Sequence, residues 1–390
     1  MEQYQRSLEI KLEALEPNHP EIAATYHEIG NVLESQGKYE EAMEQYQRSL
    51  AIKLKAYGPD HPKMAATYHQ IGNVLKSQGK YEEAMEQYQR SLAMKLKAYG
   101  PDHPEIAATY HQIGNVLESQ GKYEEAMAQY QRSLAIEKAL GLDHPKIAAI
   151  YHAIGIILES QGKYEEAMEQ YQRSLAMKLK AYGPDHPEIA ATYHQIGNVL
   201  ESQGRYEEAM EQYQRSLAIK LKAYGADHPE IAATYHQIGN ILESQGKYEG
   251  AMKQYQRSLV IEKALGLDHP KIAATYHQIG KILESQGKYE EAMGQYQRSL
   301  AIKLKALGPD HPEIAATYHQ IGNVLESQGK YEEAMEQYEK SLMNSQGDHP
   351  GLVKILITKA DLSKTESKFE DAAKFYGLAL TIGHLLNFTR

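Results

Sequence analysis

The dipeptide His-Pro recurs along this chain at a nearly constant interval, and that interval constrains the fold more than any other feature. Successive copies are 42, 42, 41, 42, 42, 41, 42 and 38 residues apart. Their histidines are His19, His61, His103, His144, His186, His228, His269, His311 and His349. A period of this size indicates a solenoid, in which each unit buries its apolar face only against its neighbours. We expect such a chain to present surfaces rather than to perform chemistry.

Composition narrows the class of protein further. The 390 residues carry 52 acidic against 42 basic side chains, a net charge of -10, which argues against extended contact with nucleic acid. Cysteine is absent, which excludes disulfides and thiolate metal sites. No apolar run approaches the roughly 20 residues that span a bilayer, and the N-terminus is polar. These features predict a soluble cytoplasmic protein with no membrane partner.

Each repeat reads as two helices, here called helix A and helix B. In residues 60–100, Asp60-His61-Pro62 opens helix A, with Asp as the expected cap and Pro in the first turn. In the next repeat Asp102 and Glu105 have the spacing of a capping box.

The ends of the two helices are marked by glycine. Gly79 can adopt the left-handed conformation that ends a helix, so helix A is expected to stop there. Helix B then begins near Lys80, and Gly100-Pro101 terminates it.

Apolar residues at helical spacing define the faces that pack together. Gly72 and Ala84 are expected where helices A and B approach closely. Three tyrosines per repeat, at the positions of Tyr68, Tyr81 and Tyr88, are predicted to lie in the core.

The order of these residues resembles the tetratricopeptide repeat, and its 42-residue length resembles the repeats of kinesin light chains. The pattern is an aromatic, then an aliphatic residue and Gly, then Tyr, Ala and an aromatic. It is carried here by Tyr68, Ile71, Gly72, Leu75, Tyr81, Ala84 and Tyr88. Tyr stands where the family usually has Trp, and Leu75 where it has Tyr. The resemblance covers residues 18–345 and implies an all-α fold: a right-handed α-solenoid, or superhelix, of stacked antiparallel helix pairs.

The repeats divide the chain into three parts. Residues 1–17 are expected to form an orphan helix B of a truncated repeat, as in a fragment of a longer array. Residues 18–345 hold eight near-identical units. Residues 346–390 keep only the outline of a repeat and are expected to cap the array, or alternatively to form a distinct docking helix. Several repeats recur at 125 residues, which indicates that a block of three was copied as a unit.

In the tetratricopeptide family helix A lines a concave groove that binds extended peptides or partner helices. By position, the resemblance assigns three rows of groove residues. The first row is His27, His69, His111, His152, His194, His236, His277 and His319. The second is Asn31, Asn73, Asn115, Asn198, Asn240 and Asn323. The third is Glu34, Glu118, Glu159, Glu201, Glu243, Glu284 and Glu326, with Lys76 interrupting it.

The chemistry of these rows predicts the kind of ligand. An Asn amide both donates and accepts, so a row of Asn can hold the backbone of an extended peptide, as family members do. The alternative is that each Asn bonds to the adjacent helix A. The Glu row makes the groove acidic and favours a basic or neutral ligand, although polar rows are also what a solvated helix face looks like.

The His row does not have the pattern of a metal site, because each repeat contributes one His and neighbouring copies are expected about 10 Å apart. We therefore predict neither a metal nor a cofactor. One hypothesis is that these histidines make the charge of the groove sensitive to pH. The histidine of each His-Pro pair is expected to start a helix rather than to bind a ligand.

No phosphate loop, nucleophile elbow or metalloprotease motif is present in the sequence, so the chain is not predicted to be an enzyme. The favoured function is a protein–protein interaction scaffold that binds a peptide or helix in the groove. Two alternatives stay open at this point. One is the sensor or scaffold part of a larger multidomain protein. The other is a structural spacer or rod that associates end to end, which an engineered consensus array would also resemble.

Overall fold

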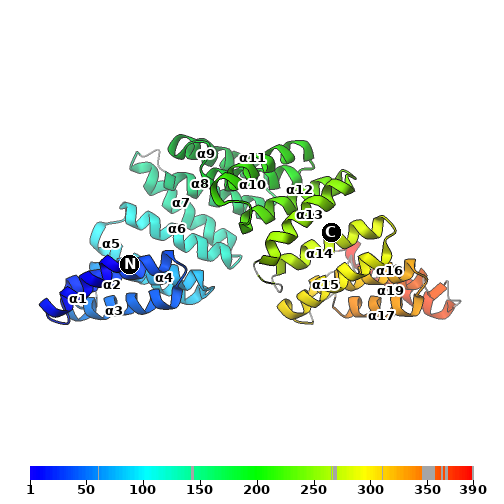
Figure 1. Cartoon of the computed structure of the whole chain (residues 1–390), viewed down its shortest axis with the longest axis horizontal. Helices are drawn as coiled ribbons and strands as arrows, with labels where there is room; N and C mark the ends of the chain where they lie inside the picture. The colour runs from blue at the N-terminus through cyan, green and yellow to red at the C-terminus, as the bar shows by residue number, and fades with distance from the viewer. Residues whose placement is uncertain are drawn as a thin grey trace. The chain divides into compact units, whose positions relative to one another are not determined.

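The computed structural model describes residues 1–59, 61–141, 145–264, 266, 270–309, 311–344, 356–361, 363–364 and 368–388. The regular structure in these residues is helical, and the helices pack in consecutive pairs, as Figure 1 shows. The predicted all-α solenoid of stacked antiparallel helix pairs is thereby confirmed. The chain divides into two compact units, Met1–Gln203 and Gly204–Arg390.

The first unit begins with a single helix, α1 (Glu2–Ala14), followed by alternating A and B helices. Its A helices are α2 (Pro20–Ser35), α4 (Ala65–Ser77), α6 (Pro104–Ser119), α8 (Pro145–Ser160) and α10 (Pro187–Ser202). Its B helices are α3 (Tyr39–Tyr57), α5 (Tyr81–Tyr99), α7 (Tyr123–Ala139) and α9 (Tyr164–Tyr182). A short 3-10 helix, η1 (Pro62–Met64), precedes α4.

The second unit continues the same alternation. Its B helices are α11 (Tyr206–Tyr224), α13 (Tyr248–Ala264), α15 (Tyr289–Leu307), α17 (Tyr331–Met343) and α19 (Phe369–Phe388). Its A helices are α12 (Pro229–Ser244), α14 (Pro270–Ser285) and α16 (Pro312–Ser327). No helix in the described part of the chain is long and apolar enough to cross a membrane.

Histidine, not aspartate, caps the A helices, which corrects the prediction from the sequence. His103 precedes Pro104 in extended backbone, and its Nδ1 accepts a hydrogen bond from the backbone N–H of Glu105 at 3.2 Å. Because the helix begins at Pro104, Asp102 lies one residue too early to cap it. Glu105 is then the second helical residue rather than the third, so no capping box forms. The same cap recurs at His19, His61, His186, His228 and His311. His144, His269 and His349 lie outside the described residues.

The prediction that glycines end the helices is confirmed. Gly79, between helices A and B, has a φ of 74°, and Gly100, after helix B, has a φ of 78°. Both are values that L side chains rarely adopt.

A second set of glycines brings helices A and B together inside each repeat. A Cβ atom built at Gly114 of α6 would lie 2.5 Å from Cε1 of Tyr130 on α7. Tyr130 itself has no exposed surface. A larger side chain at Gly114 would therefore displace either the ring or the helix. The same Gly–Tyr contact recurs in the described repeats, as between Gly30 and Tyr46. The predicted close approach is confirmed.

The three tyrosines of each repeat are not equivalent, which corrects the prediction that all three lie in the core. Tyrosines at the position of Tyr88 are completely buried. Tyr68 is half-buried on helix A, with the guanidinium of Arg90 5.9 Å from its ring centroid. The tyrosine that begins helix B is the most exposed of the three, reaching 40% exposure at Tyr248. It lies in the first turn, where only one face touches helix A.

The chain offers a matched test of the Gly–Tyr contact. We expect Gly114→Ala to lower the free energy of unfolding by about 1–3 kcal/mol, because the added methyl overpacks the A–B contact. Gly294 also lies inside a helix, but a Cβ there meets nothing within 4 Å. Gly294→Ala should therefore stabilise the chain by about 0.5–1 kcal/mol through helix propensity. Urea unfolding followed by circular dichroism measures both, and equal effects would contradict the packing argument.

Candidate interaction groove

The A helices form the closely packed side of each unit. In the first unit α2, α4, α6, α8 and α10 contact one another in sequence, and in the second α14 contacts α16. Pockets instead open between successive B helices. The His, Asn and Glu rows thus lie on the A side.

Each fully buried tyrosine reaches through its repeat and places its hydroxyl among the groove residues. The Tyr130 hydroxyl lies 2.7 Å from Asn115 Oδ1 and 2.6 Å from Glu118 Oε2. Its single proton is shared between these two acceptors. Tyr46, Tyr255 and Tyr338 make the same pair of contacts with their own Asn and Glu. The Asn and Glu rows are therefore tied to the core.

The two rows substitute for each other where one is interrupted. Lys76 replaces the Glu beside Tyr88, and the hydroxyl of Tyr88 keeps Asn73 at 2.6 Å. Ile156 replaces the Asn beside Tyr171, and that hydroxyl keeps Glu159 at 2.7 Å. Lys281 likewise replaces an Asn, and Tyr296 keeps Glu284 at 2.6 Å. Each of these buried hydroxyls retains an acceptor.

A row of glutamines, which the sequence interpretation missed, lies one residue after the histidines. Asn115 Nδ2 donates to Gln112 Oε1 on the same helix at 3.1 Å. Asn73, Asn198, Asn240 and Asn323 bond to their own Gln in the same way. Gln70 also donates across the repeats to Asn31 at 3.2 Å. The expected contact between an Asn and the adjacent helix A thus occurs, but most Asn contacts stay within one repeat. The Gln three residues before these Asn residues was the available signal; Asn31 has Glu28 there and donates to it instead.

The Glu row is half-buried rather than fully solvated. Burial raises the pKa of Glu118, and the hydrogen bond from Tyr130 opposes part of that shift. The pKa values of Glu34, Glu159 and Glu284 are raised for the same reason. Lys281 partly neutralises the row by pairing with Glu243 at 2.8 Å, whereas Lys76 donates to Gln112 at 2.8 Å. A cation that reached these carboxylates would relieve the cost of their burial.

The histidines of the His row lie between helices. Their side chains are more buried than those of residues that line an open groove. The ring of His69 packs 5.3 Å from the ring of Tyr88, and its Nδ1 lies 3.5 Å from Thr109 Oγ1 on the next A helix. His27, His152 and His236 make the equivalent contact with the following threonine. His111 lacks it, because Ile150 stands in place of the threonine, and its buried Nδ1 has no hydrogen-bond partner. His194, His277 and His319 hold the same position on α10, α14 and α16.

This burial overturns the hypothesis that the histidines switch the charge of the groove near neutral pH. Burial is the main cause that lowers their pKa to about 4, with nearby lysines contributing at some positions. The histidines so affected are His27, His69, His111, His152, His236 and His277. They stay neutral across the physiological range. Among the described residues, no three His, Asp or Glu side chains gather where a metal ion could be held.

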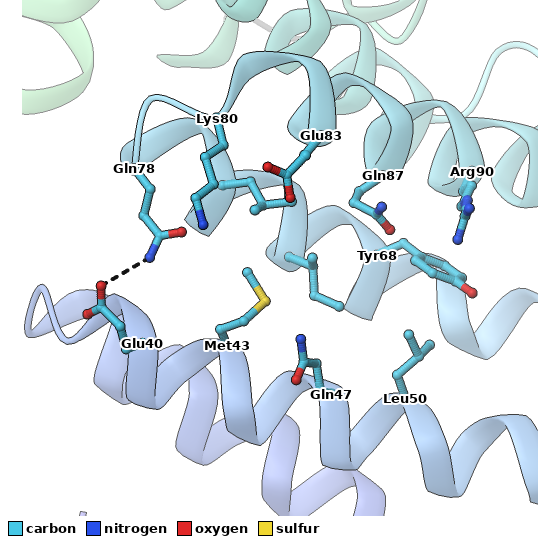
Figure 2. Close-up of a pocket in the computed structure, with 12 residues that line it drawn as sticks. Glu40, Met43, Gln47, Leu50, Tyr68, Gln78, Lys80, Glu83, Gln87 and Arg90 are labelled. Atoms are coloured by element: carbon cyan, nitrogen blue, oxygen red, sulfur yellow. Dashed lines mark hydrogen bonds between the residues drawn. The ribbon is translucent and has the colours of Figure 1, made fainter.

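A different surface lies between the B helices. One pocket, with a volume of about 480 Å³, has walls from α3 and α5 and a floor from α4. Figure 2 shows Met43, Gln47 and Leu50 on one wall. Gln78 closes one end through a 3.3 Å hydrogen bond to Glu40. An equivalent pocket of about 380 Å³ lies between α5 and α7. This B side was not singled out from the sequence.

Comparison with known proteins identifies the repeat. The sequence model of the tetratricopeptide repeat matches overlapping stretches from residue 2 to residue 346. The chain belongs to the tetratricopeptide-repeat family. The resemblance read from the sequence is thereby confirmed. No curated protein matches the chain.

Solved structures of tetratricopeptide repeats resemble the chain at low identity. Nearly identical repeats of a putative kinesin light chain from Podosopora anserina are 25% identical, covering 53% of this chain and 98% of theirs, with a TM-score of 0.44. The apo quorum sensor NprR from B. thuringiensis is 16% identical over 90% of this chain and 99% of its own, with a TM-score of 0.63. A signal transduction ATPase with a tetratricopeptide repeat sensor from Pyrococcus horikoshii is 16% identical, covering 88% and 54%, with a TM-score of 0.64. The last two show the fold.

The depressed histidine pKa values predict acid destabilisation. In the unfolded chain these histidines titrate near pH 6.5, whereas in the fold their pKa is about 4. As pH falls through this window the unfolded state binds protons that the folded state does not. Stability is therefore lost between about pH 6.5 and 4. Each histidine contributes at most about 3 kcal/mol.

His111→Gln tests the origin of this slope, because no Nδ1 hydrogen bond is lost with the ring. We expect urea midpoints of the variant to fall less steeply than those of the wild type between pH 6.5 and 4. The raised pKa of the groove carboxylates acts in the opposite direction in both proteins, so the difference between them isolates the histidine. Parallel slopes would show that His111 does not contribute.

Proposed function

We propose that the chain is a protein-interaction scaffold whose A-side groove binds an extended peptide or a partner helix. The observation that supports this most is the pair of amide groups, Asn with Gln, that recurs on A helices of each unit. Asn115 and its copies each have two amide hydrogens, and the contact to Gln112 uses one of them. The second hydrogen and the carbonyl lone pairs are suited to a peptide backbone.

The ligand is proposed to be basic or neutral. The half-buried carboxylates at Glu118, Glu201, Glu243 and Glu326 line the same face as the amides, and burial raises the pKa of Glu118. Lysine or arginine side chains would pair with these groups in a partly desolvated site, where such bonds are stronger than in water. The histidines contribute by positioning the tyrosines, because they pack against those rings.

A peptide-display selection on the intact chain tests the groove. The best variants are Asn31→Ala, Asn115→Ala, Asn240→Ala and Asn323→Ala combined, because each adjacent tyrosine keeps its Glu acceptor. Asn73 is left unchanged, since it is the acceptor that Tyr88 retains. We expect the combined variant to stay folded and to lose about tenfold or more in affinity for the selected peptides.

The matched control changes exposed glutamines on the B side, combining Gln47→Ala, Gln89→Ala, Gln131→Ala and Gln256→Ala. It should bind as the wild type does. Equal binding by the groove variant, or loss in the control alone, would contradict the A-side proposal.

The charge preference has a test of its own. Glu118→Gln and Glu326→Gln keep an acceptor for the tyrosine hydroxyl but remove the negative charge. We expect the selected peptides to lose their enrichment in Lys and Arg, and their binding to become less dependent on salt. Unchanged enrichment in Lys and Arg would show that these carboxylates only accept hydrogen bonds from the buried tyrosines and do not bind the ligand.

End-to-end association of the chain stays a second hypothesis. Tyr4 on α1 is 39% exposed, whereas its counterpart Tyr46 has no exposed surface. Light scattering across a concentration series checks it: a constant mass would exclude a self-assembling rod.

A further inference from the structure

Each helix B packs against the helix A of the next repeat, and we call this contact a joint. At each joint helix B contributes one charged side chain. Lys95 on α5 is only 2% exposed. Its Nζ lies 3.1 Å from Thr109 Oγ1 and 3.0 Å from Glu105 Oε2, both on α6. Lys178 and Lys220 repeat this arrangement with the next helix A, and their distances to the partner carboxylate are 3.0 and 3.1 Å. Lys303 pairs with Glu313 at 3.8 Å.

Two joints carry the opposite charges. Glu137 and Glu262 stand at the position of these lysines and are 2% and 3% exposed. The following A helices carry Lys146 and Lys271 where the others carry Glu105 and its copies. Burial raises the pKa of Glu262, and three smaller effects oppose that shift: hydrogen bonds from Thr275 and Ser258, the latter at 3.1 Å, and the nearby positive charge of Lys271. Both members of the pair have therefore changed sign together.

The helices before the reversed joints also differ in length. α7 and α13 have 17 residues, whereas α3, α5, α9, α11 and α15 have 19. The reversed charges thus accompany a His-Pro spacing of 41 rather than 42 residues, at both places where they occur.

A third kind of joint shows what happens when the signs do not match. At this joint Lys53 on α3 holds the position of Lys95, and Lys63 stands where most A helices carry Glu, so no ion pair can form between them. Lys63 Nζ instead lies 3.0 Å from the hydroxyl of Tyr57. Lys53 keeps Thr67 Oγ1 at 2.7 Å, and burial lowers its pKa to about 8. At this joint helix A begins with the 3-10 turn η1 rather than with α-helix.

We propose that the two faces of each repeat form a self-recognition surface with two charge classes, which sets how stably one repeat stacks on the next. A B face with a buried Lys accepts an A face with Glu, and a B face with a buried Glu accepts one with Lys. Leaving a buried charge beside a like charge is strongly unfavourable, because desolvation is no longer offset. The partner of this surface is the neighbouring repeat of the matching class in the same chain.

The classes give a physical reason for the copying of repeats in blocks of three. Residues 125 apart, such as Glu137 and Glu262, belong to the same class, so a whole block re-creates matched joints at its ends. Removal or insertion of one repeat can instead join two faces of the same sign.

Two deletions of one repeat test the proposal. Removing residues 62–103 places Lys53 before Glu105, which is a matched joint. Removing residues 104–144 places Lys95 before Lys146, which is mismatched. We expect the first to melt cooperatively, with hydrogen-exchange protection at the new joint equal to that at the Lys178–Glu188 joint, and the second to lose about tenfold or more in protection there.

The decisive substitution is Lys146→Glu, because its effect must change sign with context. In the full-length chain this substitution places a second Glu opposite Glu137, so it should lower the hydrogen-exchange protection of α7 and α8. In the chain lacking residues 104–144 it faces Lys95 and should raise protection. Lys63→Glu should likewise raise protection at the α3–α4 joint. The exposed Lys97→Glu, with the same change in charge, should alter none of these.

An effect of the same sign for Lys146→Glu in both backgrounds would overturn the proposal. So would equal protection in the two deletions, or a change with Lys97→Glu as large as with Lys63→Glu. The effect of Lys146→Glu in the full-length chain can be measured without any deletion. The proposal can therefore still be contradicted if a deletion variant folds poorly.

Discussion

The contact between one glycine and one tyrosine ring in each repeat sets the distance between helices A and B, and the rest of the structure depends on that distance. The ring of Tyr130 lies where a Cβ on Gly114 would be. Glycine allows the close approach, and the aromatic ring supplies the buried area. Alanines such as Ala126, also fully buried, serve the same approach from helix B. The repeat is thus a thin, stiff pair of helices that can stack many times.

The same tyrosine couples the core to the groove. A ring long enough to fill the A–B contact brings its hydroxyl to the groove face, and a buried hydroxyl needs a hydrogen-bond partner. The Asn and Glu rows supply that partner, which accounts for their recurrence without any ligand. The interrupted repeats show that one acceptor suffices, since Tyr88 has Asn73 and Tyr171 has Glu159. Groove chemistry is therefore constrained by stability: a repeat can exchange one row member for Lys or Ile only while it keeps the other.

Much of the fold follows from the sequence, because its repeat makes each inference eight times over. Helix periodicity, the left-handed Gly79 and the close contact at Gly72 are local or pairwise features, and they were predictable. The cap was not, because Asp102 and His103 are both polar and adjacent, and the choice depends on which residue precedes the first helical turn. The helical phase of the candidate groove residues was predictable, but their environment was not. The His row has the helical phase of a groove residue, yet its neighbours Tyr88 and Thr109 come from two other helices. Burial by three helices, which depresses the pKa, cannot be read from one helical face.

The groove and the joints place opposite demands on near-identical repeats. A ligand bound on the A side as proposed would meet recurring Asn, Gln and Glu, interrupted at Lys76, Ile156 and Lys281, so added repeats lengthen the site more than they change its chemistry. The joints between repeats are buried, and identity there would leave nothing to distinguish one stacking order from another. The pairs Lys95–Glu105 and Glu262–Lys271 differ at the joints while the Tyr–Glu contacts beside them stay alike. The charges thus reverse at the joints between repeats, whereas the contacts of the buried tyrosine with its Glu recur. Under the two proposals, an array could change length in matched blocks while most of the candidate groove residues recur.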